Sequence, residues 1–290
     1  MWIQKSFEQK QGALYVVGTP IGNLGDLSPR AQEVLAQVDL IAAEDTRHTR
    51  KLLSKFNFST PLVSYHEHNK IQRGEELIER LQNGESIAIV SDAGMPAISD
   101  PGEDLVKLAV QKRIPVIPIP GPNAALSALV ASGLPTQPFL FLGFLPRTTR
   151  ERKTQLRRWV HVPATLLCYE APHRLVSMLE DVLEVMGDRV IAISREMTKK
   201  HEEWLRGSLS ECLEYVKKEG TKGEYTIVIA GADEYIEEES KKWWEDLSVI
   251  EHVEHYLAQG KPKKEAIQLT AQDRGLPKRE VYNLYHAEQR

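Results

Sequence analysis

The chain of 290 residues lacks any long uninterrupted apolar run. Its most apolar stretch, residues 114–145, is broken by six prolines and three glycines, whereas a membrane-spanning helix needs roughly 18 to 20 consecutive apolar residues. The first eleven residues carry three charges and no apolar segment, unlike a secretory signal. We therefore expect no membrane span, and the scarcity of cysteine favours a location in the reducing cytoplasm.

Cysteine is scarce as well. The two cysteines, Cys168 and Cys212, have neither the spacing of a zinc site nor the density of a disulfide scaffold. His66 and His68 offer two imidazoles without a third ligand nearby, so no metal site is predicted. The first glycine-rich turn lacks the Gly-Lys-Ser/Thr sequence of a P-loop, which excludes that kind of nucleotide site there.

Positive charge is not in excess either. The formal net charge is −4 at pH 7, so the chain is not basic on every face, but affinity for polyanions depends on where the cations cluster. Six cations lie between residues 147 and 158, where only Glu151 offsets them. At helical spacing they form a broad face suited to phosphate groups, although a solvated helix face would carry the same pattern. The predicted phosphate contacts are Arg47, Arg147, Arg150, Arg152, Lys153 and Arg157, with Lys263, Lys278 and Arg279 near the C-terminus.

Short apolar runs alternate with helical patterns through the first 230 residues. In the first half, strand-like runs at 13–17, 40–43, 86–90 and 116–119 alternate with helical patterns at 27–38, 47–56, 75–82 and 104–112. Such alternation predicts a mainly parallel sheet flanked by helices. In the second half, helical patterns at 123–132, 149–159, 174–186 and 209–218 alternate with strand-like runs at 139–143, 165–169, 190–194 and 225–230. The second half therefore predicts a further α/β layer with a mixed sheet.

The composition changes after Gly231. An acidic stretch follows at 233–239, and no strand-like run comes after it. A helical pattern at 263–271, a turn at 274–276 and a second helix at 278–287 are typical of a helix-turn-helix. We therefore predict an N-terminal α/β domain over 12–121, a second α/β domain over 122–232 and a small helical domain over 236–290.

Three segments rich in glycine or proline directly follow strand-like runs, at 17–26, 91–102 and 119–125. Missing side chains let a backbone approach a ligand closely, although each segment by itself is also compatible with a tight turn. Ligands of open α/β sheets bind where the carboxyl ends of the strands meet. Together the three segments predict a ligand cleft between the two halves of the chain.

These segments occur together with FLGFLPR at 141–147, YEAPHR at 169–174 and REMTK at 195–199. In this combination, the chain resembles the ribosomal RNA small subunit methyltransferase I family of the tetrapyrrole methylase superfamily, over about residues 12–231. The first two segments depart from the Val-Gly-x-Gly-Pro-Gly-Asp and Gly-Asp-Pro turns of the wider superfamily, which argues against a porphyrin substrate. The resemblance implies a two-domain α/β fold with a cleft between the domains, plus a small C-terminal helical domain.

The resemblance also implies an enzyme that uses S-adenosylmethionine, without a metal, to methylate the 2′-hydroxyl of a cytidine in 16S ribosomal RNA. The implied substrate is the assembled 30S subunit, and the implied oligomer is a homodimer. The expected phosphate contacts then become RNA contacts. By correspondence of motifs, the cofactor contacts are expected at Ile21, Asp92, Ala93, Gly94, Ala97, Asn123, Ala124, Glu170, Met197 and Thr226.

A ribose hydroxyl is a weak acid, so a side chain that accepts its proton accelerates the reaction. The candidates are Asp45, Asp100 and His173, which all stand at the ends of strands or turns facing the expected cleft. The sequence does not rank them, and Asp45 beside Glu44 also suits the N-terminus of a helix.

Two other functions remain open at this point. A small-molecule methyltransferase of the same superfamily would need no cation cluster beside its cleft. A non-enzymatic nucleic-acid-binding protein built around the helix-turn-helix would leave the three glycine-rich segments without a purpose. Salt-dependent affinity for RNA would count against the first alternative. Loss of RNA binding on truncation after Gly231, in a chain that never methylated anything, would favour the second.

Overall fold

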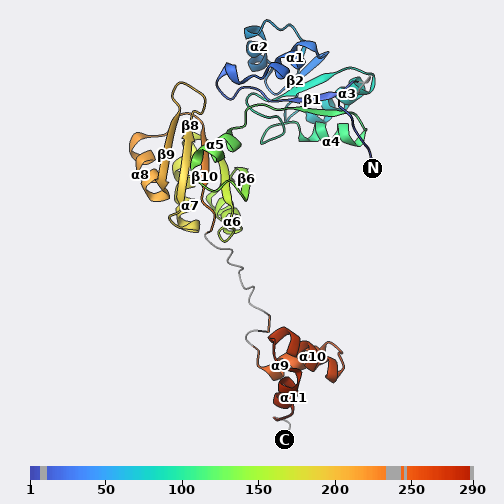
Figure 1. Ribbon diagram of the computed structural model, residues 1–290, viewed down its shortest axis with the longest axis vertical. Coiled ribbons are helices and arrows are strands. Elements are labelled where there is room, and N and C mark those ends of the chain that lie inside the picture. Colours follow the sequence, from blue (N-terminus) through green and yellow to red (C-terminus); the bar gives the residue numbers. More distant parts are fainter. Residues whose placement is uncertain (7–11, 233–242, 245–246, 288–290) are drawn as a thin grey trace. The chain divides into compact units, whose positions relative to one another are not determined.

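The computed structural model describes residues 1–6, 12–232, 243–244 and 247–287 (Figure 1). The chain forms two compact units, residues 1–234 and residues 235–290. None of the described helices is long and apolar enough to cross a membrane. The predicted boundary between 121 and 122 falls inside the first unit and stays a prediction. The predicted start of the third domain at 236 lies outside the described residues.

The first half of the larger unit is a parallel sheet of five strands in the order β3-β2-β4-β1-β5. The strands are β1 (Leu14–Val17), β2 (Leu40–Ala43), β3 (Leu62–Ser64), β4 (Ile87–Val90) and β5 (Val116–Ile119). The helices are α1 (Pro29–Gln37), α2 (Thr46–Lys55), α3 (Lys70–Gln82) and α4 (Glu103–Gln111), with the short 3-10 helix η1 (Leu24–Asp26). Apolar side chains of α1 and α2 pack on one face of the sheet, and those of α3 and α4 pack on the other.

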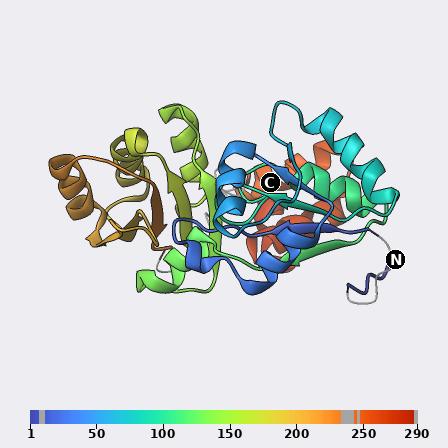
Figure 2. The same cartoon turned by 90° about the horizontal axis from the view of Figure 1, so that it is seen from above.

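The second half is a mixed sheet in the order β6-β7-β10-β8-β9, in which only β6 and β7 run parallel. The strands are β6 (Phe139–Phe144), β7 (Thr165–Glu170), β8 (Val190–Arg195), β9 (Glu203–Ser208) and β10 (Tyr225–Ile229). The helices are α5 (Ala124–Ser132), α6 (Thr149–Arg157), α7 (Pro172–Met186) and α8 (Leu209–Glu219). In Figures 1 and 2 this sheet lies beside the first one within the same unit.

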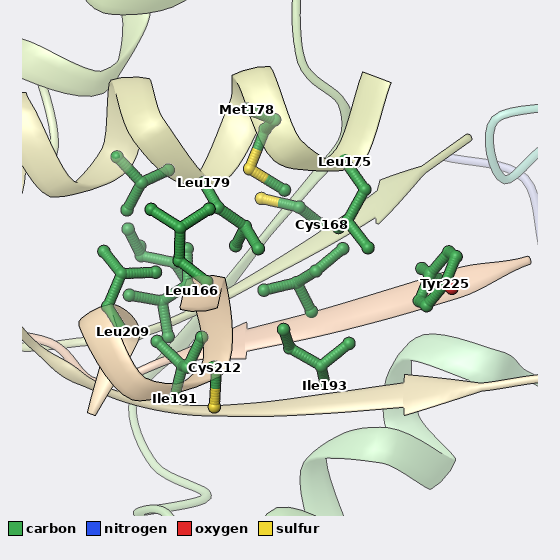
Figure 3. Packing of buried hydrophobic residues seen from close by; sticks show 14 of the residues in the cluster. Leu166, Cys168, Leu175, Met178, Leu179, Ile191, Ile193, Leu209, Cys212 and Tyr225 are labelled. Atoms are coloured by element: carbon green, nitrogen blue, oxygen red, sulfur yellow. The ribbon is translucent and has the colours of Figure 1, made fainter. Parts of the chain in front are cut away.

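The two faces of the second sheet have separate apolar cores. Helices α6, α7 and α8 cover one face. Figure 3 shows Met178 and Leu179 of α7 packed with Cys168 of β7 in this core. Helix α5 covers the other face, and its Ala128 and Leu129 belong to a smaller apolar cluster. Helix α5 therefore covers only part of this second face, and the uncovered part of the sheet is available to form a site.

The smaller unit contains the helices α9 (Val249–Ala258), α10 (Lys263–Arg274) and α11 (Lys278–Ala287). Gly275 ends α10 with a left-handed backbone, φ 63°, a conformation that glycine adopts without strain. The core consists of buried side chains from all three helices, namely Val253 of α9, Ala266, Ile267 and Ala271 of α10, and Val281 and Tyr285 of α11. The expected helix-turn-helix is present as α10 and α11, whereas α9 was not predicted.

Helix α6 is held to α7 by a buried ion pair. The Nη2 atom of Arg152 lies 2.5 Å from Oδ2 of Asp181, and the two side chains are 2% and 8% exposed. Arg152 lies four residues before Leu156, the other buried residue of α6. The prediction that Arg152 contacts RNA phosphates is therefore corrected: this cation points into the protein and is neutralised there.

Replacing Arg152 with alanine leaves the carboxylate of Asp181 buried without its main partner. We expect Arg152→Ala to lower the free energy of unfolding by about 3–5 kcal/mol, measured by denaturant-induced unfolding. Arg150→Ala, which removes an exposed cation of the same helix, is the control and should change stability by less than about 0.5 kcal/mol. Equal stabilities of the two variants would contradict a structural role for Arg152.

Candidate active site

The turns that follow β1, β4 and β5 are joined into one structure at the carboxyl edge of the first sheet. The N–H of Thr19 donates to the carbonyl of Gly94 at 2.9 Å, and the N–H of Gly94 donates back to Thr19 at 3.0 Å. The N–H of Gly18 donates to the carbonyl of Ile119 at 3.2 Å. The three glycine- or proline-rich segments therefore meet, as adjacent parallel strands require.

Two glycines allow this meeting. A Cβ atom at Gly18 would lie 2.7 Å from Cα of Gly121 and 2.7 Å from the sulfur of Met95. A Cβ atom at Gly121 would lie 2.8 Å from Cα of Gly18. The turns after β1 and β5 thus pack backbone against backbone, at a distance that no side chain permits.

A cavity of about 440 Å³ lies between these turns and the uncovered part of the second sheet. Eight of the expected cofactor contacts line it: Ile21, Ala93, Gly94, Asn123, Ala124, Glu170, Met197 and Thr226. Asp100, a catalytic candidate, lines it too. The segments chosen from the sequence therefore converge on one cavity.

The two other cofactor candidates, Asp92 and Ala97, do not line the cavity. Oδ1 of Asp92 accepts a hydrogen bond from the N–H of Asp45 at 3.2 Å, which ties the end of β4 to the end of β2. Ala97 has a positive φ of 66° within the loop that leads to Asp100. Both residues belong to the loop beside the cavity but do not contribute to the cavity wall.

The floor of the cavity contains buried polar groups from the second sheet. Glu170 and Ser194 are 2% and 1% exposed. Oε1 of Glu170 accepts from the N–H of Ala171 at 2.9 Å and faces Arg174 at 3.2 Å. Among the described residues, Oε2 of Glu170 and Oγ of Ser194 have no hydrogen-bond partner. Burial raises the pKa of Glu170.

Side chains missed by the sequence reasoning also line the cavity, namely Ser194, Tyr169, Phe144 and Tyr225. Thr226 pairs with Tyr169 on one side and with Ser194 on the other. Their side chains therefore share a face of the sheet, because directly paired residues point the same way. The motifs at 141–147 and 169–174 contain Phe144 and Tyr169. The register of the strands, which cannot be read from the sequence, places these side chains beside Thr226 and Ser194.

Asp100 differs from the other carboxyl groups near the site. Burial, reinforced by the negative charge of Glu44, raises its pKa to about 6. Burial also raises the pKa of Glu44, whose Oε2 accepts from the N–H of Asp92 at 3.3 Å. The carboxyl groups of Asp100, Glu44 and Asp92 thus lie at the same edge of the sheet, and their mutual repulsion favours the protonated form of Asp100.

In the part of the chain that the structure describes, no cluster of His, Cys, Asp or Glu could hold a metal ion.

The two other catalytic candidates have different environments. Asp45 caps α2 and forms an ion pair of 2.7 Å with Arg47, whose hydrogen bonds hold the pKa of Asp45 well below its usual range. His173 lies in the first turn of α7, is exposed and does not line the cavity. Of the three candidates, only Asp100 lies in the cavity wall.

The predicted phosphate contacts outside Arg152 are mostly on the surface. Arg147, Arg150 and Arg157 are exposed. Lys153 is only 19% exposed and pairs with Glu184 at 2.5 Å. Strand β6 ends at Phe144 in the cavity wall, so Arg147 follows within about 10 Å of chain.

The remaining predicted contacts are exposed as well. Arg47 is 84% exposed despite its pairing with Asp45. In the smaller unit, the Nζ atom of Lys263 lies 4.8 Å from the ring centre of Tyr285. Lys278 and Arg279 are exposed at the start of α11.

Comparison with known proteins assigns the chain to a family. The family model described as Tetrapyrrole (Corrin/Porphyrin) Methylases matches residues 13–213. The chain belongs to the tetrapyrrole methylase family. This assignment confirms the superfamily that the motifs indicate.

Within this family, the chain is similar to curated relatives called Ribosomal RNA small subunit methyltransferase I. The relative from Halalkalibacterium halodurans is 52% identical over 290 residues, covering 99% of this chain and 100% of the relative. The relative from Bacillus subtilis is 50% identical over 288 residues, covering 99% of each chain. The relative from Synechocystis is 45% identical, covering 94% of this chain and 97% of the relative. The narrower resemblance is thereby confirmed.

Solved structures share the tetrapyrrole methylase fold. Uroporphyrin-III C-methyl transferase from Thermus thermophilus complexed with S-adenyl homocysteine superimposes with a TM-score of 0.54 at 20% identity, covering 75% of this chain and 97% of that chain. A diphthine synthase superimposes with a TM-score of 0.58 at 17% identity, covering 76% and 90%. At these identities the likeness shows the fold alone, and it confirms the predicted fold class.

The contact between Gly18 and Gly121 yields a prediction about stability. We expect Gly18→Ala to lower the free energy of unfolding by about 1–3 kcal/mol, because the added methyl group meets backbone that has little room to move. Thermal or denaturant-induced unfolding measures the change. Gly74→Ala is the control. Gly74 lies inside α3, and a Cβ there would meet only the side chain of Leu108 in α4, at 3.5 Å. This substitution should leave the free energy of unfolding unchanged or slightly raised. A Gly18→Ala protein as stable as the control would refute this packing.

Proposed function

We propose that the chain transfers a methyl group from S-adenosylmethionine to the 2′-hydroxyl of a cytidine in 16S ribosomal RNA. Full-length similarity to curated relatives named for the methylation of small-subunit ribosomal RNA supports the substrate class. From the structure, the cavity that combines the expected cofactor contacts with Asp100 supports the reaction. This combination in one cavity is the observation that carries the proposal.

The cavity suits S-adenosylmethionine in size and chemistry. Its volume of about 440 Å³ lies within the range of roughly 300–1,000 Å³ that small-molecule sites occupy. Ala93, Gly94 and Ala124 present little bulk to a ligand. A ligand that donates hydrogen bonds to the buried oxygens of Glu170 and Ser194 would offset a desolvation penalty of about 1–3 kcal/mol for each.

When bound, S-adenosylmethionine supplies an electrophilic methyl group for in-line attack by a hydroxyl oxygen. The contribution of the protein begins with alignment of the hydroxyl, an effect worth up to about 7–11 kcal/mol. A carboxylate that accepts the hydroxyl proton adds roughly 10² to 10⁴ in rate. We assign this role to Asp100, because a pKa of about 6 leaves it ionised at pH 7 and makes it a stronger base than an ordinary aspartate.

Asp45 and His173 suit this role less well. The hydrogen bonds from Arg47 make Asp45 a weaker base than an ordinary aspartate. His173 lies outside the cavity lining. We therefore propose that Asp45 holds the start of α2 and that His173 takes no proton from the substrate.

For the RNA, we propose contacts to phosphates at the exposed cations Arg147, Arg150 and Arg157, with further contacts at Arg47 and Lys153. In the smaller unit, Lys263, Lys278 and Arg279 extend the same proposal. The assembled 30S subunit as substrate, a homodimer as the working form and the cytoplasm as the place of action rest on the family resemblance. Gel filtration with light scattering tests the dimer.

The proposed reaction predicts a labelled ribose. Incubation with tritium-labelled S-adenosylmethionine and 30S subunits from cells that lack the modification should place label on one 2′-O position, mapped by nuclease digestion and mass spectrometry. Fully modified 30S subunits are the control and should take up no label. Binding of the cofactor without any label on RNA would favour a small-molecule substrate instead.

The role of Asp100 predicts a particular dependence on pH. The base must be ionised, so the rate should rise with pH, reach half of its maximum near pH 6 and become constant about one to two units above it. Asp100→Asn should lower kcat by roughly 10² to 10⁴ and remove this rise, measured under single-turnover conditions. Glu103→Gln, an exposed carboxylate at the start of α4, is the control and should behave as wild type. An unaltered pH profile in Asp100→Asn would exclude Asp100 as the base.

A further inference from the structure

Strand β6 contains an irregularity that redirects one aromatic side chain. Phe141 pairs with Leu167 of β7, but Gly143 and Phe144 pair with the next two residues, so the register shifts by one residue. Gly143 has a positive φ of 62°, which is typical of a bulge of this kind. In a regular strand Phe144 would point to the face opposite Phe141, because successive side chains alternate.

With the bulge, Phe144 lies on the same face as Phe141 and lines the cavity instead of entering the core beneath α7. The rings of Phe141 and Tyr169 are 5.1 Å apart, and those of Tyr169 and Phe144 are 5.7 Å apart, each pair edge to face. Phe141 and Tyr169 are half-buried, whereas Phe144 is 54% exposed. A row of aromatic rings therefore runs from the protein interior to an exposed ring at the mouth of the cavity.

The position of Phe144 relates it to the proposed chemistry. It lines the same cavity as Asp100, and the bulge touches the loop of Asp100, since a Cβ at Gly143 would lie 3.1 Å from Oγ of Ser99. On the other side, the exposed cation Arg147 follows three residues later in the chain. An exposed aromatic ring between a carboxyl group and cations is suited to a nucleotide, which presents a flat base, a ribose hydroxyl and a phosphate.

We propose that Phe144 stacks on the base of an unpaired nucleotide and thereby holds its ribose at Asp100. This inference rests on the proposed function. Proteins that recognise single-stranded RNA stack unpaired bases on aromatic side chains, and the π-face accepts any base. Phe144 is thus a residue that positions the substrate, while the cations hold the adjoining phosphates.

The experiment compares Phe144→Ala, Phe144→Leu and Phe144→Trp with wild type, using unmodified 30S subunits and tritium-labelled S-adenosylmethionine. We expect kcat/KM for 30S subunits to fall about 10- to 100-fold in the alanine and leucine variants, because leucine keeps the apolar volume but lacks a π-face. Tryptophan should restore most of the activity. Calorimetry with S-adenosylhomocysteine should give affinities within about twofold of wild type for all three variants.

Phe139→Ala is the matched control. Phe139 lies on the same strand, pairs with Thr165 on the same face and is 39% exposed, but it does not line the cavity. Its removal should leave kcat/KM unchanged.

Four results would overturn the inference. A parallel loss of affinity for S-adenosylhomocysteine would mean that Phe144 covers the cofactor, and full activity of Phe144→Leu would mean that only apolar volume matters. If wild type labels no RNA, the proposed function fails and the stacking role fails with it. The wild-type reaction distinguishes this case from a failure of the stacking role alone. If only the stacking role is wrong, wild type labels RNA and Phe144→Ala labels it equally well.

Discussion

The site depends on the direct contact between the backbones of Gly18 and Gly121. Because these two turns touch, and because Thr19 and Gly94 exchange two backbone hydrogen bonds, the loops after β1, β4 and β5 form one rigid edge. Asp100 belongs to the loop that continues from Gly94, so this loop is anchored at its start to the turn after β1. A site built in this way loses little conformational entropy when a ligand binds, which is the physical advantage of preorganisation.

The second sheet contributes the other wall through a loop with a strained backbone. Glu196 and Thr198, between β8 and β9, have positive φ angles of 50° and 66°, and such conformations cost about 1–3 kcal/mol each outside glycine. The carboxylate of Glu196 accepts from Nζ of Lys199 and from the N–H of Glu224, which fixes the loop. The hydroxyl of Thr198 accepts from the N–H of Asn23 at 3.1 Å, so the strained loop also joins the two halves of the unit next to Met197.

Much of the fold could be predicted, because hydrophobic periodicity is a local property. The bounds predicted for β2, β5 and α11 are those of the structure, and the alternation of strands and helices is correct. Strands β3 and β9 were missed because one is three residues long and both are only half-buried at the edges of their sheets. Arg152 was misassigned although its spacing of four residues from Leu156 indicates the buried face of the helix. For the site, motifs located the segments, whereas Ser194 and Phe144 depend on strand register, which is not local.

The role of a carboxyl group, finally, is decided by what surrounds it and not by its place in a motif. Asp45 and Asp100 both follow strands of the first sheet and look equivalent in the sequence. Asp45 meets a guanidinium and backbone N–H groups, which stabilise its charge and make it unreactive toward protons. Asp100 is half-buried near the negative charge of Glu44, which destabilises its charge and brings its pKa to about 6. The same edge of the sheet therefore carries two carboxyl groups of opposite character, because Arg47 stabilises the charge of Asp45 whereas burial and the charge of Glu44 destabilise that of Asp100.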